Sequence, residues 1–130
     1  MAGKERPKCE DDLFCGVNRV EDAENMTDLQ KKHVPVISAP ESVKKGECFA
    51  VTIEVGKHLA HPNERGHYIH FVELYADETF IGRVDFMPVT TCPTAQFCVQ
   101  LEHIHEKLRA FEFCNLHGVW EGDANLIVKE

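Results

Sequence analysis

The 130-residue sequence contains no apolar run close to the roughly 20 residues that a membrane-spanning helix requires. Its first residues, MAGKERPKCEDD, are charged and lack the apolar stretch of a secretory signal. Positive charge is also scarce, because 14 lysines and arginines stand against 22 aspartates and glutamates, a formal net charge of −8. Because a phosphate backbone binds a basic face, we expect no nucleic-acid partner. From the first two observations we expect a cytoplasmic protein without a membrane partner.

Internal repeats, low-complexity tracts and Cys-x-x-Cys motifs are also missing. The missing motif matters because the chain has six cysteines and eight histidines. In a reducing compartment disulfides are disfavoured, so several thiols more often indicate metal or redox chemistry. A content of 43% hydrophobic and 28% charged residues is typical of a globular chain, and the length fits one domain.

Short strand-like runs follow one another from about residue 31. In ECFAVTIEVG, Phe49, Val51, Ile53 and Val55 alternate with more polar neighbours, which is the period of a half-buried strand. Comparable runs are KKHVPVI, HYIHFVELYAD, TFIGRVDFMP, AQFCVQLE, KLRAFEFC and ANLIVKE. The stretches APESVKKGE, HPNERG, PVTTCPT and EGDAN have the composition of turns or loops. We therefore predict one all-β domain over residues 31–130, an antiparallel β-sandwich or barrel, preceded by a cysteine-bearing arm over residues 1–30. The only helical candidate is EDAENMTDLQKK.

Histidines and cysteines gather in three separate stretches of the sequence. The loop GKHLAHPNERGHYIH carries four histidines within thirteen residues: His58, His61, His67 and His70. FCNLHGVWEG places Cys114 and His117 with two residues between them, and His33 opens the run HVPVI. Imidazoles with one thiolate suit iron, zinc or copper. Cys-x-x-His is also half of many structural zinc sites, which leaves zinc as an alternative.

Three stretches, KHVPVI, VGKHLAHPNERGHYI with ELY after it, and CNLHGVW, resemble the superoxide reductase family (desulfoferrodoxin and neelaredoxin) in the same order. The resemblance covers about residues 31 to 128. It implies an immunoglobulin-like β-sandwich of about seven strands and a mononuclear iron that reduces superoxide to hydrogen peroxide by one electron. The iron ligands that it implies are four equatorial histidines and one axial thiolate: His33, His61, His67, His117 and Cys114. His58 and His70 stand where the family motif requires no histidine.

The resemblance also implies roles for two lysines. Lys32, in KHVP, matches the family residue that holds a positive charge beside the open iron position, where it would attract the superoxide anion; an ordinary solvated lysine is the alternative. The family usually has a glutamate at the position of Lys31, and that carboxylate can bind the oxidised iron. Lys31 cannot do so. A rubredoxin-like electron donor and a homo-oligomer, a dimer or a tetramer, are further implications of the family.

The other cysteines form two Cys-x5-Cys pairs and one single thiol. The pairs are Cys9 with Cys15 and Cys92 with Cys98. Four cysteines are the usual ligands of a [4Fe–4S] cluster, so we predict such a cluster as an electron relay, as in the methanoferrodoxin branch of the family; zinc or no metal are the alternatives. We expect Cys48, inside a predicted strand, to be a buried apolar thiol. A β-sandwich electron carrier or zinc-stabilised binding protein without turnover is the alternative function.

Overall fold

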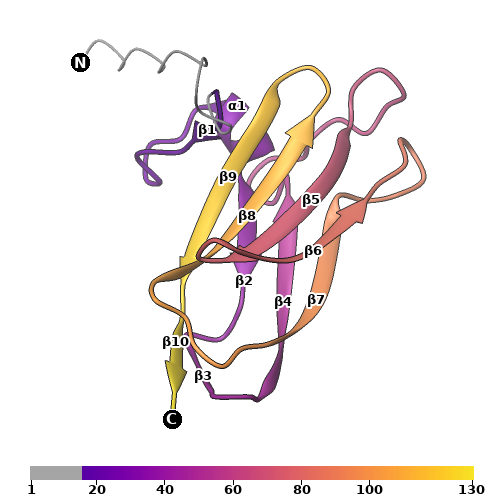
Figure 1. Ribbon diagram of the computed structural model, residues 1–130. Helices are drawn as coiled ribbons and strands as arrows, with labels where there is room; N and C mark the ends of the chain where they lie inside the picture. Colours follow the sequence, from indigo (N-terminus) through magenta and orange to yellow (C-terminus); the bar gives the residue numbers. More distant parts are fainter. Residues whose placement is uncertain (1–15) are drawn as a thin grey trace.

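Residues 16–130, the part of the chain that the computed structural model describes, fold almost entirely into β-strands (Figure 1). The strands are Asn18–Arg19 (β1), Pro35–Ser38 (β2), Ser42–Lys44 (β3), Cys48–Val55 (β4), Ile69–Ala76 (β5), Thr79–Asp85 (β6), Thr94–Gln100 (β7), Lys107–Cys114 (β8), Gly118–Asn125 (β9) and Ile127–Lys129 (β10). The helix α1 spans Asp28–His33. The all-β prediction is therefore confirmed, with more and shorter strands than the sequence indicates.

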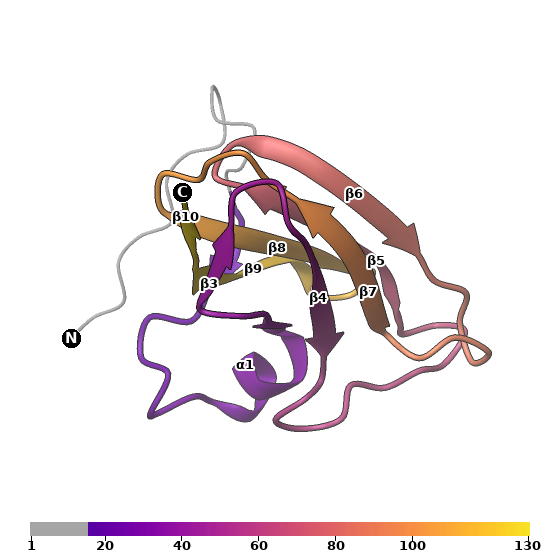
Figure 2. The same cartoon turned by 90° about the horizontal axis from the view of Figure 1, so that it is seen from below.

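The strands form two facing layers with the core between them (Figures 1 and 2). One layer is a five-stranded sheet in the order β1-β9-β8-β5-β6, and the other is a three-stranded sheet in the order β2-β4-β7. Strands β10 and β3 pair separately, in parallel. Val51 and Ile53 of β4 are fully buried opposite Leu74 of β5 and Leu108 of β8. The alternation predicted for β4 is confirmed, and each such side chain contributes about 1.5–3 kcal/mol by leaving water.

The stretch EGDAN, which has the composition of a loop, lies instead within β9, so that expectation is wrong. Strand β9 pairs with β8 along its whole length, from Cys114↔Gly118 to Lys107↔Asn125. Gly122 is needed there because β2 crosses very close to it: a Cβ on Gly122 would overlap the carbonyl oxygen of Pro35. Glycine in a strand often marks such a close backbone approach. Here it lets β2 lie directly against β9.

The helical stretch is shorter than the candidate EDAENMTDLQKK, and it ends on a residue of the predicted metal site. Thr27 accepts a hydrogen bond from the N–H of Gln30, and the Gln30 side chain accepts one from the N–H of Thr27, which is a capping box. The helix ends at His33 because Pro35 follows and disfavours helical backbone at Val34. Within residues 16–130, no helix is long and apolar enough to span a membrane.

Part of the predicted arm belongs to the sheet. Asn18 and Arg19 form β1, which pairs in parallel with β9 at Trp120 and Glu121. Arg19 donates to Glu121, whose carboxylate also accepts from Arg109 of β8. Glu121 is only 3% exposed. This ion-pair network links β1 to the outer face of the five-stranded sheet.

Candidate metal centre

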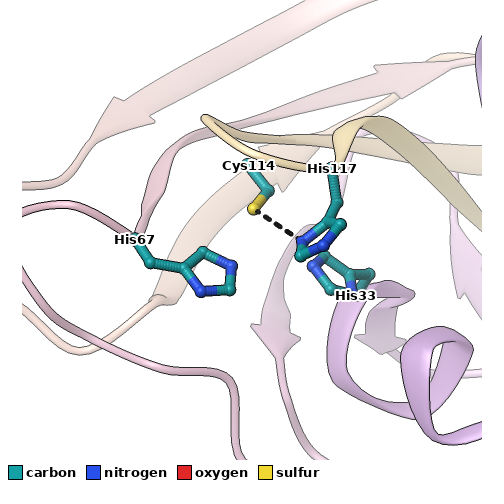
Figure 3. A group of neighbouring side chains, drawn as sticks. All are labelled: His33, His67, Cys114 and His117. Carbon is teal, nitrogen blue, oxygen red and sulfur yellow. Dashed lines mark hydrogen bonds between the residues drawn. The ribbon is translucent and has the colours of Figure 1, made fainter.

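Four side chains from separate elements converge at one end of the sandwich (Figure 3). His33 ends α1, His67 precedes β5, Cys114 ends β8, and His117 lies in the turn to β9. One potential ligand atom from each lies within 4.8 Å of the corresponding atoms of the others. These distances are short enough for a single metal ion to contact all four groups.

His61, from the loop after β4, lies against the same group. Its Nε2 is 3.4 Å from the Cys114 sulfur, and its ring centroid is 4.7 Å from that of His33 and 4.6 Å from that of His67. The structure thus brings together all five residues that the sequence analysis expects as iron ligands. His58 is exposed, and His70 stacks on the Tyr68 ring at 4.1 Å, so neither belongs to the group.

Hydrogen bonds orient two of these rings toward the centre of the group. The Nδ1 of His33 lies 2.7 Å from the carbonyl oxygen of Leu29, and the Nδ1 of His61 lies 2.6 Å from that of Pro62. Because a carbonyl can only accept, each Nδ1 carries the proton and each Nε2 keeps its lone pair. Such a second hydrogen bond is the usual companion of a metal-binding histidine.

The group contains buried nitrogens that have no protein partner. The Nε2 atoms of His33 and His67 are both buried without a hydrogen bond. Leaving a buried polar atom unsatisfied costs about 1–3 kcal/mol, and most such atoms in proteins have a partner. A cation at the centre would bind both lone pairs, so the residues present fit a bound metal.

Burial also sets the protonation states that a metal needs. It lowers the pKa of His61 to about 4 and shifts the pKa values of His33 and His67 in the same direction, and neighbouring histidines add to each shift. The three imidazoles are therefore neutral at neutral pH and able to bind a cation. Burial raises the pKa of the Cys114 thiol, opposed by the backbone N–H groups of Leu116 and His117. A coordinated metal would overcome this and deprotonate the thiol.

Comparisons with known proteins agree with this geometry. The family model described as desulfoferrodoxin matches residues 25–123. The chain belongs to the desulfoferrodoxin family.

Individual relatives cover most of the chain. A protein of Methanocaldococcus jannaschii named putative superoxide reductase is 39% identical over 119 residues, which are 89% of this chain and 97% of that protein. The superoxide reductase of Pyrococcus furiosus is 37% identical, over 74% of this chain and 89% of that protein. Among solved structures, the superoxide reductase (neelaredoxin) from Ignicoccus hospitalis superposes with a TM-score of 0.75 at 33% identity, covering 88% of this chain and 96% of that chain.

Two residues to which the sequence assigns no role hold the candidate metal ligands in place. The Trp120 ring stacks on His33 at 5.2 Å, and its Nε1 donates to the carbonyl of His117 at 3.1 Å. Asn115 accepts from the N–H of Tyr68 at 3.0 Å and donates to the carbonyl of Gly66 at 2.8 Å. The second pair of bonds ties the loop that carries His67 to the turn after Cys114. Both residues lie in CNLHGVW, and that is the only signal for them in the sequence.

Glu112 is a third residue that sequence reasoning missed. It is fully buried, and neither carboxyl oxygen has a hydrogen-bond partner. Burial raises its pKa well above the usual range, which favours the protonated form. The signal was present in KLRAFEFC, because Glu112 falls on the inward-facing positions with Leu108, Ala110 and Cys114.

Cys92 and Cys98 do not lie together as their pairing in the sequence suggests. Strand β7 is extended from Thr94, and the hydrogen bond from the N–H of Val55 to the carbonyl of Pro93 shows that the pairing with β4 reaches Pro93. Pro93 and Cys98 are therefore separated by about 16 Å of extended strand. This speaks against Cys92 and Cys98 binding the same cluster. Cys9 and Cys15 lie outside the described residues. The expectation of a buried Cys48 is wrong: it begins β4 on the exposed face.

Proposed function

We propose that this protein is a superoxide reductase that adds one electron and two protons to superoxide and releases hydrogen peroxide. The observation that carries the proposal is the five-residue group of Cys114 and the four histidines His33, His61, His67 and His117, with buried and unpartnered nitrogens at its centre. The relatives named superoxide reductases support it. These five residues would hold a mononuclear iron, which supplies the electron when bound by cycling between Fe(II) and Fe(III).

Each protein group has a task in this reaction. The imidazoles would bind the metal as uncharged ligands, without adding negative charge near an anionic substrate. The Cys114 thiolate would donate electron density to the metal, as cysteine does in some haem enzymes. Trp120 and Asn115 fix the orientation of the ligands, and ligand distances of metal sites tolerate errors of only about 0.2 Å.

Lys32 attracts the substrate. The whole protein carries a formal charge of −8, which repels superoxide, so capture depends on a local positive charge. The charge of Lys32 contributes to lowering the pKa values of both His33 and His67, which supports a position beside the site. No ion pair found within residues 16–130 involves this lysine. With Lys31 in place of the family glutamate, the oxidised site has no carboxylate ligand from this position.

Two further parts of the proposal follow from family membership. The electron comes from a small donor protein of the rubredoxin type, and the chain assembles as a homodimer or homotetramer. A cytoplasmic location is also part of the proposal. The [4Fe–4S] cluster expected on Cys9, Cys15, Cys92 and Cys98 stays a prediction, although the extended strand between Cys92 and Cys98 does not favour it. Iron analysis tests it, because a cluster and the mononuclear site together give about five irons per chain, with acid-labile sulfide.

The Cys114→Ser variant tests the proposal directly. We expect protein purified without oxygen to contain iron and, once oxidised, to show a thiolate-to-Fe(III) absorption band. Cys114→Ser should lose the band and superoxide reduction while keeping the β-sheet circular dichroism spectrum. Cys92→Ser removes an exposed thiol outside the site and should change neither property. Zinc as the only bound metal in native protein, or full activity in Cys114→Ser, would overturn the proposal and favour a carrier or binding protein without turnover.

A further inference from the structure

Cys98 has a neighbouring thiol, but it is Cys48 and not Cys92. Strands β4 and β7 lie side by side in the three-stranded sheet (Figure 2), with Ala50 opposite Cys98 and Cys48 opposite Gln100. Cys48 and Cys98 are therefore diagonal neighbours, one on each strand. Both are exposed, so both point away from the core, on the outer face of the sheet.

The register places both thiols at non-hydrogen-bonded positions of the two strands. The hydrogen bond from Val55 to Pro93 makes the odd-numbered residues of β4 the hydrogen-bonded positions. The even-numbered positions are then non-hydrogen-bonded pairs, whose side chains lie closer together. Cys48 and Cys98 also line the same surface hollow, with Phe49, Ala50, Gln96 and Phe97 as its other walls and a volume of about 380 Å³.

The spacing suits a bridging cation better than a disulfide. Diagonal neighbours have Cα atoms about 7–8 Å apart, whereas a disulfide usually requires 4.4–6.8 Å and a sulfur separation near 2.05 Å. Two zinc–sulfur bonds of about 2.3 Å at a tetrahedral angle hold the sulfurs about 3.8 Å apart, well beyond the sulfur separation of a disulfide. A cation can therefore join the two thiolates without moving the strands, and the open hollow leaves room for water or a small thiol to complete its coordination.

We propose that Cys48 and Cys98 form a second metal site that binds one thiophilic d10 cation such as Zn²⁺. Cd²⁺ is a cation of the same class that can serve as a spectroscopic probe. Thiolates prefer such soft cations, and binding releases the two thiol protons. The site lies on the outer face of β4 and β7 and shares no residue with the iron ligands. It therefore does not depend on the proposed superoxide reductase activity.

Cadmium titration of the iron-loaded protein, kept reduced with a phosphine that does not bind the cation, tests this site. We expect one Cd²⁺ per chain, with an ultraviolet thiolate-to-cadmium band, an unchanged iron content and an unchanged thiolate-to-Fe(III) band on later oxidation. Cys48→Ser and Cys98→Ser should each weaken binding about a hundredfold, because a chelating pair becomes a single ligand. Cys92→Ser is the matched control, since it removes an exposed thiol near the start of β7 that is outside the hollow.

Three results would overturn the site. The first is no cadmium band in the native protein. The second is a loss of affinity in Cys92→Ser as large as that in Cys98→Ser, which would indicate scattered single thiols. The third is a disulfide, seen as a mass loss of two hydrogens under peroxide that requires both Cys48 and Cys98, in protein that binds no cadmium.

Discussion

Gly122→Ala should separate two strands and thereby disturb the metal site. The new methyl group would overlap the Pro35 carbonyl oxygen and lie 3.1 Å from the carbonyl carbon. Non-bonded carbon atoms pack at about 3.5–4.0 Å. Both Pro35 atoms that the methyl group meets belong to the backbone, so no side-chain rotation can relieve the contact. Strand β2 must therefore move away from β9 by roughly 1 Å.

The displacement has a cost in stability and a cost in metal binding. Overpacking of this kind destabilises by about 1–3 kcal/mol, and we expect the upper end because the new methyl group cannot rotate away and the atoms that it meets belong to the Pro35 backbone. His33 lies two residues before Pro35 and stacks on Trp120, two residues before Gly122. A shift of roughly 1 Å exceeds the tolerance of about 0.2 Å for a metal ligand, so iron affinity should fall together with stability.

Denaturant unfolding of the metal-free protein and iron content of the loaded protein measure the two effects separately. Gly66→Ala is the matched control, because a Cβ there meets no atom within 4 Å although the residue adjoins His67. We expect that variant to stay within about 0.5 kcal/mol of the native protein, as is usual for surface substitutions. A Gly122→Ala protein with native stability and full iron content would refute this account of how β2 is held.

Lys32→Ile should slow superoxide capture about tenfold at low ionic strength, and the difference from the native rate should shrink as salt screens the charge. Stopped-flow or pulse radiolysis measures the second-order rate, and an equal loss in Lys31→Ile would contradict the role assigned to Lys32. Burial alone would raise the pKa of Glu121, but hydrogen bonds and charge, chiefly from Arg109, lower it to about 2, so the ion pairs stabilise the fold above the ordinary pKa of 4.5. The stability lost in Glu121→Gln near neutral pH should therefore diminish as the pH falls below 4.5, and an undiminished loss in acid unfolding would refute this. Asn115→Ala removes two loop-to-turn hydrogen bonds and should weaken iron binding about tenfold in chelator competition; unchanged affinity would make the bonds irrelevant to the site.

The residues of the metal site could be named because three local stretches resemble motifs of the superoxide reductase family, and the resemblance implies the ligand set. Three short stretches carry the five residues, and the alternation around Val51 and Ile53 indicates the strand that supports one of the loops. The same alternation shows that Cys48, one position before Phe49, points outward; the expectation of a buried thiol overlooked that parity. Similarly, Glu112 shares the inward parity of Leu108 and Cys114.

Strand β9 and the neighbours of Cys98 could not be predicted in this way. Gly122 has the composition of a turn, and its actual role appears only once β2 is known to cross it. The pairing of Cys98 with Cys48 depends on the register between β4 and β7, which no spacing along the chain encodes. Local patterns therefore indicate which residues face inward, whereas contacts between distant strands require the tertiary structure.

The wide separation of the five site residues along the chain has a consequence for assembly. Between His33 and His117 the chain runs through strands β2 to β8, which belong to both layers of the sandwich, so the five donors meet only when these distant strands have paired. A short peptide of this protein therefore does not contain the whole donor set, unlike a zinc finger. Iron loading would then follow folding of the chain. Iron that binds only the native state adds RT ln(1 + [Fe]/Kd) to its stability, so iron-starved cells would hold a pool that is folded but more readily unfolded and degraded.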